Sequence, residues 1–399
     1  MGFSYVLGLG GTVDYELAWD AEVLSALALR LQIGEADLDR DVTIIDERDL
    51  VRSVLAFARD GVGGERHVAS AHVLSGFAAR FRTVTSLGGT CVRAATALHH
   101  LGHPSTVHLV SIDDTVRRLL PSSVRYLCSA DRDSLDPHLI VQFPPGARVD
   151  LVEGHVVTPS ANRLIYVNDP WNRDLVLHPG LGTQIAAADA ILVSGLNSMQ
   201  HIGTLQERLD TLRTWLRGRR PGAVAMLEDA SYHVPDFPQR VRDALAREVD
   251  VWSMNEDELQ RWIGREVDLL DVADIGAALT ELAHAVQAPV RVVHTQHWAL
   301  AHGHEARRWS AALRAGITAA STRYLVGDAF TLTDHDAVAA MPPAPAHARF
   351  AAELSAAVPD VVCWGTPRLQ TQRPTTIGLG DTFVGGFLAA LAPGGGWES

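Results

Sequence analysis

Between residues 186 and 295 the chain repeats one order of segments: a helix-like stretch, a short apolar run, and a polar or glycine-rich turn. The apolar runs cover residues 191–193, 223–227, 249–254 and 290–293. Each run has the length and composition of a buried strand. Strands that alternate with helices form right-handed βαβ units, in which the strands lie parallel and helices cover both faces of the sheet. The pattern therefore predicts an α/β fold with a doubly wound main domain.

Two regions interrupt this order. Residues from about 15 to 85 contain an acidic helix-like stretch and a glycine-rich turn at 61–64, and residues from about 136 to 175 contain an alternating run at 149–157. Extended segments inserted into an α/β chain suggest a small lid of strands. We therefore expect one folded unit over residues 1–399, with a β-rich lid built from these insertions and a main α/β domain built from the remainder.

The composition excludes several classes of protein. Hydrophobic residues make up 47% of the chain and charged residues 20%, so a large core can form and global disorder is not expected. The formal net charge of −13 argues against non-specific binding to nucleic acid or to an anionic membrane. No apolar run approaches the roughly 20 residues that span a bilayer, and three cysteines without metal-ligand spacing are typical of reduced intracellular thiols. We expect a cytoplasmic protein with no nucleic-acid or membrane partner, as a monomer or a small homo-oligomer.

Polar side chains follow the predicted strands, at the edge of the sheet where ligands bind in parallel α/β folds. They are Ser194, Glu228, Asn255, Glu258, His294 and Thr295. Asn255 and Glu258 are three residues apart, so they share one face of a helix and could hold a hydrated Mg²⁺ near a polyphosphate. Glu228 is a second candidate for that metal site. The alternatives are a solvated acidic helix start for the pair, and a surface charge or a cap for Glu228.

The run Gly378-Leu379-Gly380-Asp381 precedes a helix-like stretch at 382–391. Two glycines before a helix let backbone N–H groups turn toward a ligand, and the helix N-terminus favours negative charge. A carboxylate at that point suits the removal of a proton from an attacking hydroxyl. Asp381 is therefore a candidate catalytic base beside an anion site formed by Gly378 and Gly380. The alternative is that Asp381 only caps the helix and the glycines form a turn.

Two further glycine clusters lie at 8–11 and at Gly88-Gly89, which opens a helix-like stretch at 91–101. Asp14, just beyond the first cluster, could accept hydrogen bonds from substrate hydroxyls, or could be an ordinary turn aspartate. The Gly88-Gly89 pair could let a ligand approach the backbone closely. The lysine of a Walker loop and the spacing of a dinucleotide fingerprint are both missing, so a dinucleotide-dependent oxidoreductase is not expected.

Taken in order, these residues resemble the ADP-dependent glucokinase/phosphofructokinase family, a branch of the ribokinase-like superfamily. The matching segments run from Gly8 to Asp381, and the closest are 378–382, 255–259 and 293–295. The segment 161–170 is also similar to the family's Asn-Arg-Phe-Ile stretch.

The resemblance implies a ribokinase-like, Rossmann-like main domain with a lid, and transfer of a phosphoryl group from a nucleotide, ADP favoured over ATP, to a hydroxyl of a sugar. For the reaction it implies Asp381 as the base, with the amides of Gly378 and Gly380 bound to the phosphoryl group that is transferred. For the metal it implies that Glu228 and Glu258 hold Mg²⁺ through water, with support from Asn255. At the nucleotide it implies His294 and Thr295, with Arg163 as a phosphate contact. At the sugar it implies Asp14, Gly88, Gly89 and, from the lid, Glu65.

The chain departs from the family pattern at two places. The family's His-x-Glu appears here as Met226-Leu227-Glu228, and the substrate-binding asparagine expected near Thr12 is absent. Glu65 follows a glycine pair, as does the sugar-contacting glutamate of glucokinase-type members, which favours an unphosphorylated acceptor. An ATP-dependent nucleoside or other polyol kinase of the same fold, and a non-catalytic sugar- or nucleotide-binding relative, remain as alternatives.

Overall fold

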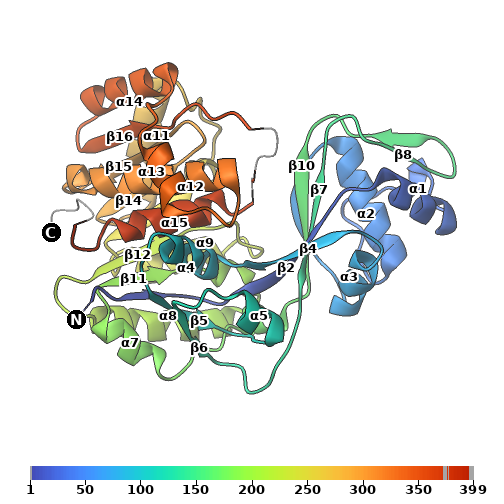
Figure 1. Cartoon of the computed structure of the whole chain (residues 1–399), viewed down its shortest axis with the longest axis horizontal. Coiled ribbons are helices and arrows are strands. Elements are labelled where there is room, and N and C mark those ends of the chain that lie inside the picture. The colour runs from blue at the N-terminus through green and yellow to red at the C-terminus, as the bar shows by residue number, and fades with distance from the viewer. Residues whose placement is uncertain (1, 372–374, 376, 395–399) are drawn as a thin grey trace.

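The computed structural model describes residues 2–371, 375 and 377–394, and a nine-stranded sheet forms the centre of its main body (Figure 1). In their order across the sheet the strands are β16 (Val361–Gly365), β15 (Trp298–Gly303), β14 (Val290–His294), β13 (Val251–Asn255), β12 (Val224–Glu228), β11 (Ala190–Val193), β1 (Tyr5–Leu7), β5 (Ser105–Leu109) and β6 (Val124–Cys128). Every neighbouring pair from β14 to β6 is parallel, and β15 is antiparallel to both of its neighbours. The predicted α/β fold with a parallel sheet is confirmed, and the four apolar runs fall on β11 to β14.

Helices cover both faces of this sheet. On one face lie α4 (Thr90–His100), α12 (Ser310–Val326) and α15 (Leu379–Ala389). On the other lie α7 (Leu181–Ala187), α8 (Ile202–Arg217), α9 (Phe237–Leu245), α10 (Glu256–Ile263), α11 (Val272–Ala285) and α14 (Pro345–Ala357). Neighbouring residues of one strand enter opposite cores, as Ile191 and Leu192 do. Strands buried on both faces need apolar residues at every position, which explains the continuous apolar runs.

Shorter elements complete the main body and the lid. They are α5 (Asp114–Leu119), α6 (Pro170–Asp174), α13 (Leu332–Ala339) and the 3-10 turns at Glu35–Asp37, Leu196–Ser198 and Ala306–Trp309. Within the described part of the chain, no helix has both the length and the apolar character needed to cross a bilayer.

A second, five-stranded sheet lies beside the main body, at the right of Figure 1. Its strands, in order, are β3 (Gly64–His67), β10 (Asn162–Val167), β7 (His138–Phe143), β2 (Thr12–Leu17) and β4 (Thr83–Gly88). One face is covered by α1 (Ala21–Arg30), α2 (Glu47–Asp60) and α3 (Ala71–Ala78), and a hairpin of β8 (Arg148–Asp150) and β9 (His155–Val157) lies next to α1 and α2. The elements come largely from the two regions that interrupt the alternation in the sequence. We call them the lid, and its action as a lid stays a prediction.

The two faces of the lid sheet differ in character. Leu164 and Tyr166 are fully buried in the core beneath α1, α2 and α3. On the opposite face Asp14 of β2 is paired with His138 of β7, and directly paired residues of neighbouring strands share a face. This face is polar and meets the main body, because Asp14 contacts Arg93 of α4.

Candidate active site

Arg93 brings two predicted site residues together from distant parts of the chain. Asp14 lies on β2, Asp381 lies in the first turn of α15, and Arg93 lies on α4. Arg93 Nη2 donates to Asp14 Oδ2 at 2.8 Å, and Arg93 Nε lies 3.8 Å from Asp381 Oδ2. The Arg93 and Asp14 side chains are each 7% exposed to solvent, whereas the Asp381 side chain is 23% exposed. A buried ion pair therefore lies next to a carboxylate that a ligand can reach.

The turn before α15 has the geometry that its glycines predict. Gly378 is the N-cap residue with a φ of 69°, in the left-handed region that favours glycine. The amides of residues 379–381 occupy the first helical turn, where a helix supplies no backbone acceptor. Thr382 N bonds back to Gly378 O at 3.0 Å, and no side chain of the described residues makes a capping hydrogen bond at this turn. The Asp381 carboxylate belongs to the same turn as these amides, and its role as a base stays a prediction.

The Gly88-Gly89 pair makes room for the Asp14 carboxylate. A Cβ atom on Gly88 would lie 2.2 Å from Asp14 Oδ2 and 2.2 Å from Thr12 Oγ1, far inside van der Waals contact. Thr12 Oγ1 donates to Asp14 Oδ1 at 2.7 Å, so the hydroxyl and the carboxylate are held together above this glycine. Gly89 has a φ of 85° and begins α4. Gly88 is thus required by the packing around Asp14, and Gly89 by its left-handed backbone.

Glu228 and His294 form a buried pair at the ends of β12 and β14. His294 Nε2 and Glu228 Oε1 are 2.9 Å apart, and Glu228 Oε2 is buried without a hydrogen-bond partner among the described residues. Burial lowers the pKa of His294, but the charge and hydrogen bond of Glu228 outweigh burial, so the pKa is raised. The ring centroids of His294 and Phe383 are 4.7 Å apart. A Cβ atom added to Gly380 would lie 3.1 Å from His294 Cε1. The pair therefore lies beside the glycine turn.

Asn255 and Glu258 form a capping box at the start of α10. Asn255 Oδ1 accepts hydrogen bonds from the amides of Asp257 and Glu258 at 2.8 and 3.0 Å, and Glu258 Oε2 accepts from the Asn255 amide at 2.8 Å. Glu258 is buried, so the alternative of a solvated acidic helix start is wrong for this residue. Burial raises the pKa of Glu258 to about 7, with the nearby charge of Glu228 acting in the same direction.

These carboxylates fit a magnesium ion that keeps most of its water. No cluster of three or more histidine, cysteine or acidic side chains is arranged to hold a metal directly in residues 2–371, 375 and 377–394. Mg²⁺ retains several waters in kinase sites and needs only one or two carboxylates besides the phosphates. The unpartnered Glu228 Oε2 and the nearby Glu258 carboxyl supply such acceptors.

Glu65 lies in a cavity of about 180 Å³ between the polar face of the lid and the residues that follow β11 and β12. His233 Nε2 lies 3.2 Å from Glu65 Oε1, and His138 Nε2 lies 3.2 Å from Asp169 Oδ2. Burial raises the pKa of Glu65, but the bond from His233 outweighs it and the pKa is lowered. Glu65 is therefore a carboxylate in a polar cavity, on the same lid sheet as Asp14.

The structure does not bring Thr295 and Arg163 into this arrangement. The Thr295 hydroxyl accepts from the amides of His297 and Trp298 at 3.0 and 3.1 Å, so it holds the turn between β14 and β15. Arg163 is exposed on β10 and pairs with Gln142 of β7, toward the end of the strands away from His138. Their roles at the nucleotide stay predictions.

Arg93 is the residue that sequence reasoning missed. Its signal was available, because Arg93 stands among Cys91, Val92 and Ala94 on a helix that begins at a glycine pair. A charged residue on an apolar helix face is buried only when it is paired. The histidines of the Glu65 cavity offered no such signal, since they meet only through the tertiary fold.

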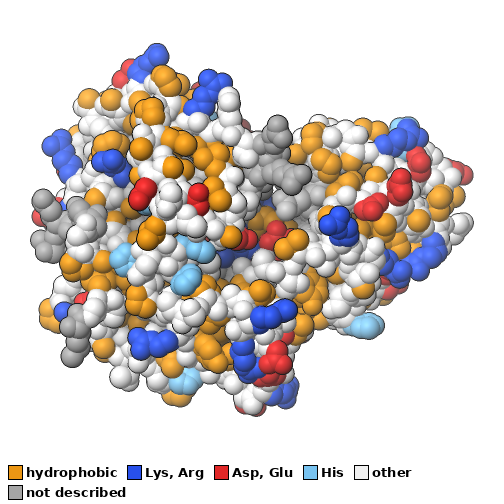
Figure 2. Space-filling view, viewed as in Figure 1, with side chains coloured by type: hydrophobic (Ala, Val, Ile, Leu, Met, Phe, Trp, Pro, Cys, Tyr) orange, Lys and Arg blue, Asp and Glu red, His pale blue; other side chains and the backbone are white. Residues whose placement is uncertain are grey.

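The candidate site lies at the junction of the two bodies. In Figure 2 the surface is hollowed between the main body and the lid, and acidic and basic side chains are visible at the floor of this hollow. The hollow is consistent with a ligand that contacts both bodies at once.

Comparison with known proteins gives a consistent result. Residues 4–389 match the model of the ADP-specific phosphofructokinase/glucokinase conserved region. A hypothetical ADP-dependent phosphofructokinase from Pyrococcus horikoshii OT3 has a similar structure, with a TM-score of 0.77, 16% identity, and 98% of each chain covered. A phosphofructokinase from the same organism with AMP has a TM-score of 0.76 at 17% identity, with 98% of each chain covered. An ADP-dependent kinase in complex with fructose-6-phosphate and ADPβS has a TM-score of 0.72 at 16% identity, with 97% of this chain and 93% of that chain covered.

At such identities the solved structures show a shared fold, which confirms the expected architecture of this chain. No curated protein matches the sequence. The family match is the stronger finding because it spans almost the whole chain, from β1 to α15. This protein therefore belongs to the ADP-specific phosphofructokinase/glucokinase family and is a carbohydrate kinase, a phosphotransferase that uses ADP and has an alcohol group as acceptor.

Proposed function

We propose that this protein is a Mg²⁺-dependent kinase that transfers the terminal phosphoryl group of ADP to a hydroxyl of an unphosphorylated sugar. The observation that carries the proposal is the group of Asp14, Arg93 and Asp381 where the lid meets the first turn of α15. Glu65 supports the choice of acceptor, because a carboxylate in the cavity accepts hydrogen bonds from sugar hydroxyls.

Asp381 is the base in this proposal. It accepts the proton of the sugar hydroxyl as the oxygen attacks, and Asp14 accepts a hydrogen bond that orients the sugar. The free amides of the glycine turn and the positive end of α15 stabilise negative charge on the transferring group. The sugar oxygen gains the phosphoryl group and ADP leaves as AMP, so the reaction is balanced without any other reactant.

Glu228 and Glu258 would hold a hydrated Mg²⁺ at the ends of β12 and α10, and the bound ion would neutralise charge on the phosphates of the donor. His294, Thr295 and Asn255 follow the same edge of the sheet and would face the nucleotide. Arg163, which lies on the lid sheet away from this edge, would reach a phosphate only after the lid moves toward the main body.

The proposal is tested by measuring AMP and sugar phosphate after incubation with ADP or ATP. The acceptors are free hexoses, hexose phosphates and nucleosides, each with Mg²⁺ and with a chelator. We expect equal amounts of AMP and hexose phosphate from ADP, only with Mg²⁺ and best with a free hexose. A preference for fructose 6-phosphate would overturn the choice of acceptor, and activity only with ATP and a nucleoside would overturn the proposed function.

Glu65→Gln tests the proposed acceptor contact. We expect the KM for the sugar to rise about tenfold, because a neutral amide accepts weaker hydrogen bonds from hydroxyls than a carboxylate does. The KM for ADP stays within about threefold of the wild-type value, since Glu65 lies on the lid, away from the edge of the main sheet where the nucleotide is predicted to bind. Steady-state kinetics with either substrate varied gives both constants. Glu153→Gln, an exposed lid residue, is the control; equal effects of the two substitutions would contradict the assignment.

A further inference from the structure

Arg93 lies against three of the predicted site residues, Asp14, Gly378 and Asp381, which come from two distant segments of the chain. Its guanidinium binds Asp14 at 2.8 Å and lies 3.8 Å from Asp381. Its stem packs against the glycine turn, because a Cβ on Gly378 would lie 2.6 Å from Arg93 Cδ. One side chain therefore lies between Asp14, which is predicted to contact the sugar, and the glycine turn that carries the predicted base Asp381.

The electrostatic environment makes Arg93 the compensating charge of this group. Burial lowers the pKa of Arg93, but the charges of Asp14 and Asp381 outweigh burial and raise it, so the guanidinium stays charged. Among the described residues, the other titratable groups facing the trio are Glu16 of β2, His138 of β7, His294 of β14 and Cys91 of α4. Burial, with the charge of Asp381, raises the pKa of Cys91 to about 12, so this thiol stays neutral. Of all these groups, Arg93 alone has a permanent positive charge.

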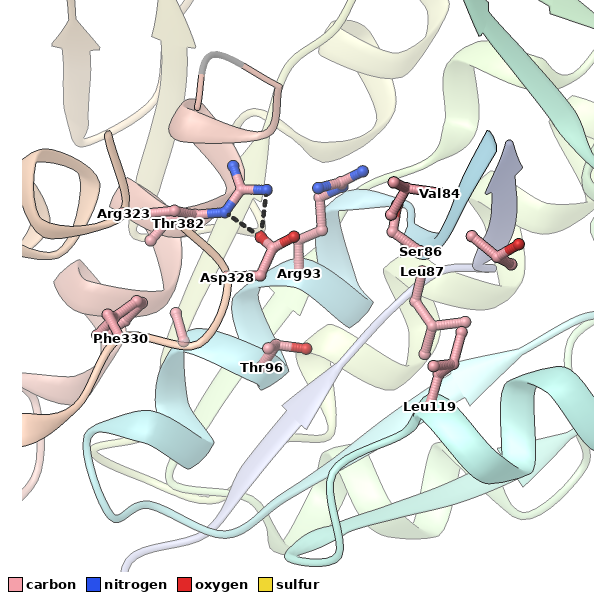
Figure 3. A pocket seen from close by; sticks show the side chains of 12 residues that line it. Val84, Ser86, Leu87, Arg93, Thr96, Leu119, Arg323, Asp328, Phe330 and Thr382 are labelled. Atoms are coloured by element: carbon pink, nitrogen blue, oxygen red, sulfur yellow. Dashed lines mark hydrogen bonds and ion pairs between the residues drawn. The ribbon is translucent and has the colours of Figure 1, made fainter. Parts of the chain in front are cut away.

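The nearby Arg323 does not duplicate this role. Arg93 and Thr96 of α4 line a cavity of about 240 Å³, with Arg323 on another wall (Figure 3). Arg323 Nε and Nη2 lie 2.7 and 2.6 Å from Asp328 Oδ1, and its Nη1 donates to the carbonyl oxygen of Ile377. Arg323 is therefore neutralised by its own carboxylate and holds the backbone ahead of the glycine turn.

We propose that Arg93 is a positioning residue for phosphoryl transfer: its Nη2 and Nε, two neighbouring nitrogens of one guanidinium, hold Asp14 and Asp381 side by side, so that the sugar hydroxyl oriented by Asp14 meets the carboxylate that takes its proton. This inference rests on the proposed function. Arg93 itself does not touch the reacting atoms. It fixes the distance between two groups that would otherwise repel each other.

Removal of the cation has a specific consequence for the pH profile. Without Arg93, the two carboxylates oppose each other and bind a proton at higher pH than in the wild type. The base works only when it is unprotonated, so the acidic limb of the kcat/KM profile moves to higher pH. The activity loss is therefore largest in acid and decreases as the pH rises.

The experiment compares Arg93→Met, Arg93→Lys and the control Thr96→Ala, which lies one turn further along α4 in the same cavity. For Arg93→Met we expect kcat to fall about 10²-fold at neutral pH, with the KM for ADP within about threefold and the acidic limb displaced upward. Arg93→Lys keeps the positive charge but lacks the planar guanidinium group. We therefore expect its kcat to be about tenfold higher than that of Arg93→Met, with the acidic limb at the wild-type position. Thr96→Ala stays within about twofold of the wild type.

An unchanged kcat in Arg93→Met, or a loss with an undisplaced acidic limb and no recovery in Arg93→Lys, would overturn the proposal. If Arg93→Met does not fold, Arg93→Lys decides alone, by keeping or losing the wild-type acidic limb. If the wild type phosphorylates no acceptor, the proposed function fails and thermal unfolding tests Arg93 separately. In that case the melting temperature of Arg93→Met should fall further below that of the wild type as the pH rises from 5 to 8, because ionisation adds repulsion between the carboxylates. A difference independent of pH would overturn the inference.

Discussion

Asp381→Asn is expected to lower kcat by at least about 10²-fold, because the amide keeps the size of the side chain but cannot take the proton of the attacking hydroxyl. Asp381 makes no capping hydrogen bond to a described residue and is the most exposed member of its group with Asp14 and Arg93, so the fold should tolerate the change. ADP should bind with a dissociation constant within about threefold of the wild-type value, since the glycine turn is unchanged.

Single-turnover kinetics measure the rate of phosphoryl transfer, and calorimetric titration measures the dissociation constant of ADP. Asp131→Asn, at an exposed aspartate of the main body, is the matched control and should leave both unchanged. Turnover of Asp381→Asn within tenfold of the wild type would show that the base is another residue.

Gly88→Ala is expected to lower kcat/KM for the sugar by about 10²-fold, because a misplacement of about 1 Å at a binding group is enough for such a loss. The new methyl group would overlap the Asp14 carboxylate and the Thr12 hydroxyl, both 2.2 Å away, so Asp14 must move. The same overlap should lower the free energy of unfolding by about 1–3 kcal/mol, the usual cost of overpacking.

Steady-state kinetics and urea unfolding test both effects of Gly88→Ala. Gly76→Ala is the control, since Gly76 lies in α3 of the lid and a Cβ there has nothing within 4 Å. An alanine at position 88 that leaves the kinetics of the sugar unchanged would remove Asp14 from the acceptor site.

The main sheet was predictable because its strands are buried on both faces. Continuous apolar runs between helices identify β11 to β14 without any long-range information. The antiparallel strands β15 and β16 were not predicted, since β15 follows β14 through a tight turn held by Thr295 and breaks the helical alternation. The lid was predictable as an interruption, but its strand order depends on pairings between residues far apart in the chain.

The site was predictable where one short segment carries it, as at the glycine turn of Asp381. It was not predictable where partners come from different strands. The resemblance led us to expect a histidine at Met226, yet Met226 is fully buried in the core and the imidazole beside Glu228 comes from His294, two strands away. A missing residue in one motif is therefore a poor guide to a missing contact, because another strand of the same sheet can supply the same chemical group.

The chain passes between the main body and the lid at the ends of β2, β4, β7 and β10, near Thr12, Gly88, His138 and Val167. These four strands are neighbours in one hydrogen-bonded sheet, so the lid is tied to the main body at several adjacent places. Asp14 lies two residues from the end of β2, so a bend at this joint moves it little while the tip of the lid moves far. The Asp14–Arg93 contact is thus close to this joint, and if the lid moves as predicted, the proposed catalytic group would stay assembled.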